Sequence, residues 1–299
     1  MVSYGGVVNI VTLVIYFIYC CLSFYCAVRH GLGRSTPWIC LIVLSLCRLT
    51  QVSIDLAATE LYPNDAPNTA LESGVAILTE LALTPLFMAT SSLLNTTGRP
   101  KGRRMQWLLI LLHIPLIVSL ILIVAGGIDP DSDIGPTFAA TEATKAGVAL
   151  YCACFVILIW ATAVISARLY LANSTEVQIL TTVVISMPFF LVDVVYMMCF
   201  AFESFWGTQK FNIISGSVTI QLCMQVIMEY IIVGLYLFLG MGLPDKAARL
   251  REQVAEMDSD EIASGFLWKM YECLSAVVAL TVMPALLFAH WMLGKLLRS

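Results

Sequence analysis

The chain has 299 residues, of which 60% are hydrophobic and only 12% are charged. A soluble protein is typically about 45–50% apolar and about 25% charged, so this composition excludes a soluble globular enzyme and a disordered chain. The net charge of −4 also argues against a nucleic-acid binder. The composition predicts an all-α, polytopic transmembrane helical bundle that lies in a lipid bilayer.

Eight stretches are long and apolar enough to cross a bilayer, which takes roughly 20 residues. In chain order they cover residues 7–28, 37–58, 72–94, 106–126, 146–169, 177–202, 213–241 and 270–294. We expect residues 1–243 to form a seven-span bundle and residues 244–264 to form a polar cytoplasmic linker helix. Residues 265–299 would then hold a C-terminal span. The first run is longer than the core of a signal peptide and lacks a basic segment before it, which predicts a retained span.

The charges in the loops between these stretches predict an orientation. Basic residues gather in the first, third, fifth and seventh loops, whereas the second and fourth loops are acidic. The positive-inside rule therefore places the odd loops in the cytoplasm and the N-terminus in the lumen, with the endoplasmic reticulum as the expected membrane. Two glycosylation sequons, at Asn95 and Asn173, fall in cytoplasmic loops, so we expect neither to be modified.

Polar side chains inside the spans are the candidate functional residues, because ionisable groups are costly in a membrane. The second span carries Arg48, Gln51 and Asp55 on one helix face, and the seventh carries Gln221, Gln225 and Glu229 on another. Glu80 lies in the third span and Asp193 in the sixth. At a rise of about 1.5 Å per residue these groups reach similar depths. This predicts one polar chamber that opens toward the lumen or toward the lumenal leaflet of the membrane.

The surplus of acids in this set indicates its chemistry. Arg48 alone cannot balance four carboxyl groups, and a carboxyl without a cation in an apolar environment stays protonated and can donate a proton. We therefore expect catalytic proton donors among Glu80, Asp193 and Asp55, and a substrate pocket shaped by Arg48, Gln51, Gln225 and Glu229. For any single residue a structural role remains open, since buried Arg–carboxyl pairs and glutamines also hold helices together.

The sequence offers no metal or cofactor motif. It has no HExxH pair, no aspartate-rich magnesium motif and no glycine-rich phosphate loop, so we expect neither a metal nor a cofactor. All ten cysteines lie in apolar runs without a CxxC pair, which is typical of buried thiols. We expect His113, in the fourth span, to make a hydrogen bond between helices.

Two segments resemble a family of fungal multi-span membrane proteins. The first is HGLGRSTPW at residues 30–38, followed by LIVLSLCR at residues 41–48; the second is LTPLF at residues 83–87, followed by SSLL at residues 91–94. Thr36 and Pro37 stand where the family pattern has a small residue and glycine. Some members of this family are similar to membrane-bound terpene cyclases of meroterpenoid biosynthesis, of the ascofuranone type.

This resemblance implies a metal-independent terpene cyclase of secondary metabolism. Such an enzyme protonates an epoxide or alkene on a hydrophobic prenylated small molecule with a farnesyl-type chain. A prenyltransferase and an epoxidase would act upstream. Two other readings of the sequence stay open. One is a seven-helix-type receptor, although the seventh span has no lysine for a retinal Schiff base. The other is a small-molecule transporter, which would be expected to show an internal repeat.

Overall fold

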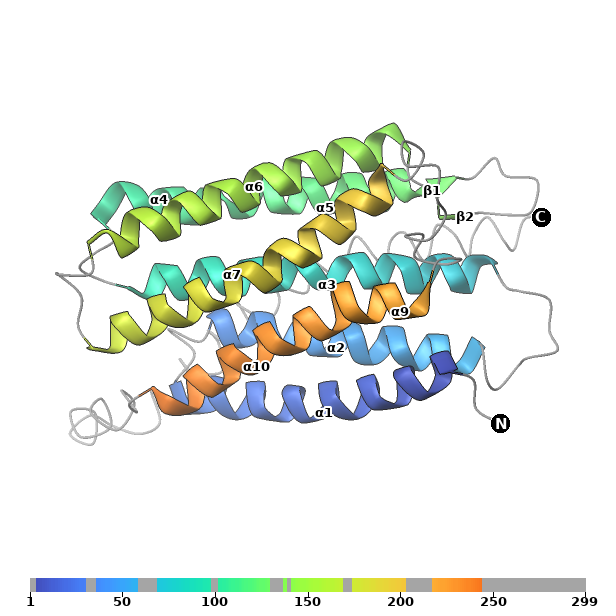
Figure 1. The fold of residues 1–299 in the computed structure, drawn as a ribbon, viewed down its shortest axis with the longest axis horizontal. Coiled ribbons are helices and arrows are strands. Elements are labelled where there is room, and N and C mark those ends of the chain that lie inside the picture. Colours follow the sequence, from blue (N-terminus) through green and yellow to red (C-terminus); the bar gives the residue numbers. More distant parts are fainter. Residues whose placement is uncertain are drawn as a thin grey trace, which may run out of the picture.

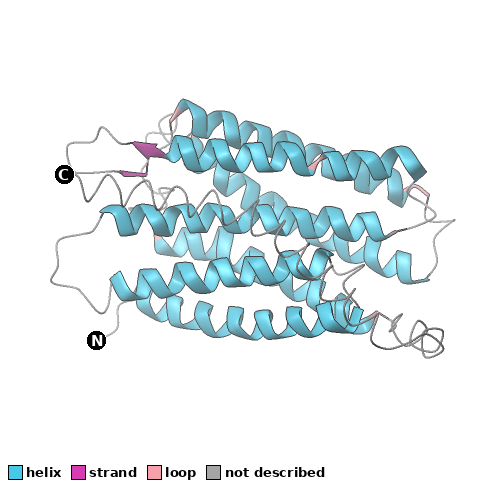
Figure 2. Ribbon diagram, turned by 180° about the vertical axis from the view of Figure 1, so that it is seen from behind, coloured by secondary structure: helices cyan, strands magenta, loops and turns pink. Residues whose placement is uncertain are grey.

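The computed structural model describes residues 4–30, 36–58, 69–97, 102–129, 137–138, 141–168, 174–202 and 217–243. Nearly all of these residues are helical, and the helices lie side by side in one elongated bundle (Figure 1, Figure 2). The prediction of an all-α membrane bundle is confirmed. Across the described residues, seven helical segments are long and apolar enough to span a bilayer. The chain is a multi-pass membrane protein.

The helices follow the expected order, with modest shifts at their ends. They are α1 (Tyr4–His30), α2 (Thr36–Leu56), α3 (Thr69–Thr96), α4 (Gly102–Leu111), α5 (His113–Gly127), α6 (Glu142–Ser166), α7 (Ser174–Ala201), α9 (Val218–Gln221), η5 (Leu222–Val226) and α10 (Ile227–Gly242). The expected eighth span at residues 270–294 and the linker helix at residues 244–264 lie outside the described residues.

Two of the seven spans are irregular. The fourth span consists of α4 and α5, which meet at Leu112 because Pro115 has no N–H to bond the carbonyl of Leu111. The seventh span contains η5, a π-helical turn between α9 and α10. Between α5 and α6, two-residue strands β1 (Ile128–Asp129) and β2 (Thr137–Phe138) pair antiparallel, with Ile128 opposite Phe138. They lie at the end of the bundle that holds the N-terminus (Figure 2).

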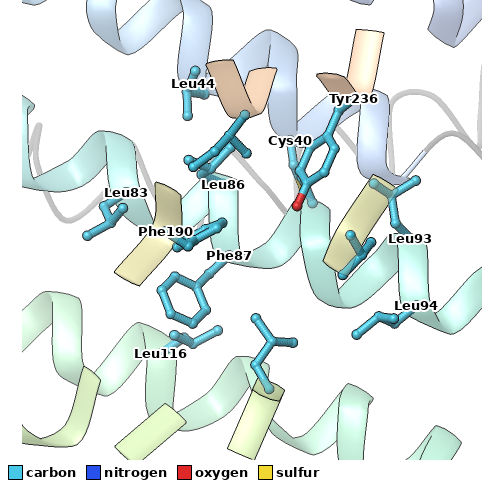
Figure 3. Packing of buried hydrophobic residues seen from close by; sticks show 14 of the residues in the cluster. Cys40, Leu44, Leu83, Leu86, Phe87, Leu93, Leu94, Leu116, Phe190 and Tyr236 are labelled. Carbon is cyan, nitrogen blue, oxygen red and sulfur yellow. The ribbon is translucent and has the colours of Figure 1, made fainter. Parts of the chain in front are cut away.

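The centre of the bundle is α3, the most buried of the spans, which packs against α2, α5 and α7. Its side chains Leu86, Phe87 and Leu94 are fully buried. Figure 3 shows Phe87 between Leu116 of α5 and Phe190 of α7. In contrast, α1 lies at the edge, against α2 and α10, and most of its large apolar side chains are exposed. This exposure is what a lipid-facing helix requires.

The HGLGRSTPW segment begins at a junction between the ends of three helices. His30 ends α1, donates a 2.7 Å hydrogen bond from Nε2 to the carbonyl of Gly240, and stacks on Trp38 at the start of α2. Arg29 donates a 2.8 Å hydrogen bond to the carbonyl of Met241. The last carbonyls of α10, which have no partner within their own helix, are thereby satisfied by α1. The part of the motif that the structure describes therefore holds the fold together.

Candidate functional site

A buried ion pair joins the second and seventh spans. The guanidinium of Arg48 donates two hydrogen bonds to the carboxylate of Glu229, and its Nε–Oε2 distance is 2.8 Å. A third donor of Arg48 reaches Oε1 of Gln51 at 2.6 Å. The hydroxyl of Tyr16, from α1, donates to Glu229 at 2.7 Å. Each charge is buried, and the pair therefore depends on these hydrogen bonds for its stability.

Two further acids lie close to this pair without a hydrogen bond of their own. Glu80 of α3 and Asp193 of α7 are 2% and 0% exposed. Neither carboxyl has a hydrogen-bond partner among the residues that the structure describes. Both interact electrostatically with Arg48 and Glu229, and Asp193 also interacts with Glu80. We call Tyr16, Arg48, Gln51, Glu80, Asp193 and Glu229 the buried polar cluster.

Helix register explains why these residues meet. Arg48 and Asp193 each lie roughly 12 Å from the ends of α2 and α7 on the N-terminal side of the bundle, at 1.5 Å per residue. Glu80 lies about 16 Å along α3 from that same side. The expectation of convergence at one depth is therefore confirmed for these residues. The expected opening toward one face of the membrane stays a prediction.

Gln225 lies in the π-helical turn, one turn before Glu229, and is completely buried. Within the described part of the chain, neither its amide nitrogen nor its amide oxygen has a hydrogen-bond partner. The π-helical turn packs against α7, the helix that carries Asp193. Such turns are rare and often occur at functional sites, because the extra residue redirects nearby side chains. Gln221 is only half-buried.

Aromatic rings border the acids on the α6 side. Tyr151 interacts electrostatically with both Asp193 and Glu80, and its hydroxyl lies beside that of Thr84 without an aligned hydrogen bond. The Tyr151 ring packs edge-on against Phe87, with ring centroids 4.6 Å apart. Phe87 also contacts Phe190 at 4.8 Å. The acids thus interact with the ion pair and with a tyrosine that belongs to a group of packed aromatic rings, and such rings can attract positive charge.

Asp55 occupies a different position from the other two candidate acids. It is half-buried and accepts a 2.8 Å hydrogen bond from Asn9 of α1. It lies on α2 roughly 10 Å beyond Arg48, toward the N-terminal end of the bundle. The structure thus places Asp55 at the contact between α1 and α2.

Sequence reasoning missed the tyrosines of this site. Tyr16 and Tyr151 read as apolar positions in apolar helices, although a buried tyrosine hydroxyl usually needs a partner. The need of a buried tyrosine hydroxyl for a hydrogen-bond partner was the signal that could have identified these two residues. His113 does make the expected bond between helices, with Nε2 3.2 Å from Oγ of Ser91. In the described ranges, no three His, Cys, Asp or Glu side chains are grouped as metal ligands would be, and none of the described cysteines forms a disulfide.

The chain was also compared with known proteins. No curated protein matches it, and no solved structure matches it. One family model matches residues 2–247, a segment that contains all of the described helices and the whole buried polar cluster. The chain belongs to this family, whose description is "Domain of unknown function (DUF7702)".

Proposed function

We propose that this protein is a membrane-embedded, metal-independent terpene cyclase. In this proposal Glu80 or Asp193 protonates an epoxide or alkene on a farnesyl-type chain. One observation carries the proposal: two buried carboxyls interact electrostatically with each other, and neither has a hydrogen-bond partner among the described residues. Carboxyls in this situation hold their protons at neutral pH and act as acids toward an apolar substrate.

The chemistry needs no external reagent. The acid transfers its proton to the epoxide oxygen, and the C–O bond breaks to leave a carbocation. Electron pairs of neighbouring alkenes then form the new C–C bonds. Loss of a proton from the last cation ends the sequence and can restore the acid. The product is an isomer of the substrate, and the rings of Phe87, Tyr151 and Phe190 would stabilise the cations on the way.

The ion pair has a different role in this scheme. Glu229 accepts hydrogen bonds from Arg48 and Tyr16, so in this scheme it has a structural role. With Gln51 it fixes the positions of α1, α2 and α10 around the acids. Gln225 would help to shape the substrate pocket. The half-buried Asp55, bonded to Asn9, ranks third as a proton donor.

The wider setting of the reaction is part of the same proposal. The charge pattern of the loops favours a lumenal N-terminus in the endoplasmic reticulum, which places the buried polar cluster in the lumenal half of the membrane. The substrate would be a prenylated hydrophobic molecule made in fungal secondary metabolism. A prenyltransferase and an epoxidase would supply it.

The experiment uses membranes that contain the whole chain and an aromatic compound with an epoxyfarnesyl chain. The wild type is expected to give a cyclised product of unchanged mass, identified by NMR. Glu80→Gln and Asp193→Asn remove acidity with little change in shape, and at least one should lower the rate by about 10²–10⁴-fold. Glu142→Gln, at the exposed start of α6, is the matched control. Full activity in Glu80→Gln, Asp193→Asn and Asp55→Asn alike would refute the acid assignment.

The number of spans favours one alternative. The described residues contain seven spans, as a seven-helix-type receptor would. A receptor would bind a small molecule in the buried polar cluster and release it unchanged. Ligand-dependent signalling without any change in the ligand's NMR spectrum would favour the receptor over the cyclase.

A further inference from the structure

Gln225 is a buried polar residue whose position proton transfer does not explain. A carboxamide neither donates nor accepts a proton at neutral pH, so it is not the acid of the proposed reaction. Its side chain can make up to four hydrogen bonds, yet none is made with any described residue. A buried polar group without partners is costly, because it has given up its hydrogen bonds to water. Cys223, two positions earlier in the same turn, is exposed. The turn therefore also has a position whose side chain faces outward, and the burial of Gln225 is specific to its own position.

The π-helical turn sets the direction of this amide. Glu229, one turn later, is fixed by hydrogen bonds from α1 and α2. An extra residue in a helical turn rotates the side chains on one side of it by about 100° relative to those on the other. The turn at Leu222–Val226 therefore orients Gln225 independently of the anchored Glu229. It points the amide into the bundle, at the depth of Asp193, on the segment that packs against α7.

The charges around Gln225 restrict what it can bind. Over the described ranges, Arg48 is the only buried lysine or arginine, and each of its three side-chain nitrogens already donates a hydrogen bond to Glu229 or Gln51. The buried acids outside that ion pair, among the described residues, are Glu80 and Asp193. An anionic head group, such as a diphosphate, would lose its water and meet acids instead of a cation. A neutral group that donates and accepts hydrogen bonds would satisfy both the amide and the protonated carboxyls.

We propose that Gln225 is the specificity-determining residue of a subsite for an uncharged, hydrogen-bonding head group, such as a hydroxyl or carbonyl group on an apolar chain. The inference rests on the proposed function for the nature of that chain. In this arrangement the amide holds the head group on the α9–η5–α10 span. The apolar tail lies against the rings of Phe87 and Phe190. Holding one end of the molecule decides which of its double bonds reaches Glu80 or Asp193.

The test measures binding to the full chain in lipid nanodiscs with four probes that share one farnesyl chain. They are a farnesyl phenol, a farnesyl benzene, farnesyl diphosphate and farnesylamine. The wild type should bind the phenol about 10-fold more tightly than the benzene, because a site built to hydrogen-bond a hydroxyl leaves its polar groups unpaired without it. In Gln225→Leu this ratio should fall toward one. In Cys223→Ala, a change in the same turn at an exposed position, it should persist.

Several results would overturn the inference. They are a phenol-to-benzene ratio near one in the wild type, an unchanged ratio in Gln225→Leu, and tighter binding of the diphosphate or the amine than of the phenol. Tighter amine binding would mean that the acids are ionised. If Gln225→Leu does not fold, Gln225→Met serves in its place, and the wild-type ratios alone still decide. Since binding needs no turnover, intact discrimination without a cyclised product would refute the proposed function and leave this inference standing. Cyclisation without discrimination between the phenol and the benzene would refute this inference and leave the proposed function standing.

Discussion

The ion pair between Arg48 and Glu229 makes the sharpest prediction about stability. Arg48→Met would leave Glu229 with the Tyr16 hydroxyl as its only described hydrogen-bond donor. Glu229→Leu would leave the buried guanidinium bonded to Gln51 alone among its described partners. Breaking a buried pair from one side costs about 3–5 kcal/mol, because the other charge stays buried without compensation. Removing both charges costs much less, because neither charge is left behind.

The assay is a double-mutant cycle on the purified protein, read by the free energy of unfolding in mixed micelles. The two single variants should each lose about 3–5 kcal/mol, and Arg48→Met with Glu229→Leu should lose less than either. Glu229→Leu should be the milder single variant, because Asp193 already interacts with Arg48 and can take the place of Glu229. A double variant that loses the sum of the two single losses would refute the reasoning. Tyr16→Phe, which removes one hydrogen bond and no charge, should cost about 1.5–3 kcal/mol.

Three further predictions test the packing and the orientation. A Cβ on Gly240 would lie 2.6 Å from the ring of Trp38, whereas one on Gly242 would meet nothing within 4 Å. Gly240→Ala should therefore lower the unfolding free energy by about 1–3 kcal/mol, and Gly242→Ala should leave it unchanged. The hydroxyl of Tyr236 joins α3 to α7 through Thr90 and Ser186, at 2.8 and 2.9 Å, so Tyr236→Phe should lower the unfolding free energy by about 1 kcal/mol. Neither sequon should carry a glycan when the chain is made in microsomes. A glycosidase-sensitive shift in gel mobility would show that the predicted orientation is wrong.

The spans and their depth could be predicted because both depend on local rules. Length and apolarity locate a membrane helix, and 1.5 Å per residue places Arg48, Glu80 and Asp193 at one level. Which partner each charge takes could not be predicted, because that depends on how α2, α3, α7 and α10 rotate against one another. The sequence offers Arg48 several carboxyls, and nothing in the spacing selects Glu229. The π-helical turn could not be predicted either, because the sequence from Gln221 to Glu229 fits regular helix spacing whether or not the turn is present.

The junction at His30 and the buried polar cluster lie at different levels of the bundle. His30 and Trp38 lock the end of α10 to the first two helices. Tyr16, the α1 residue of the buried polar cluster, lies about 21 Å from His30 along the same helix. A chain can therefore keep this junction, and with it the fold, while the acids and Gln225 change. Changes at His30 should reduce stability and activity together, whereas Glu80→Gln and Asp193→Asn should separate them. This separation makes the two acids the more informative positions for deciding what the protein does.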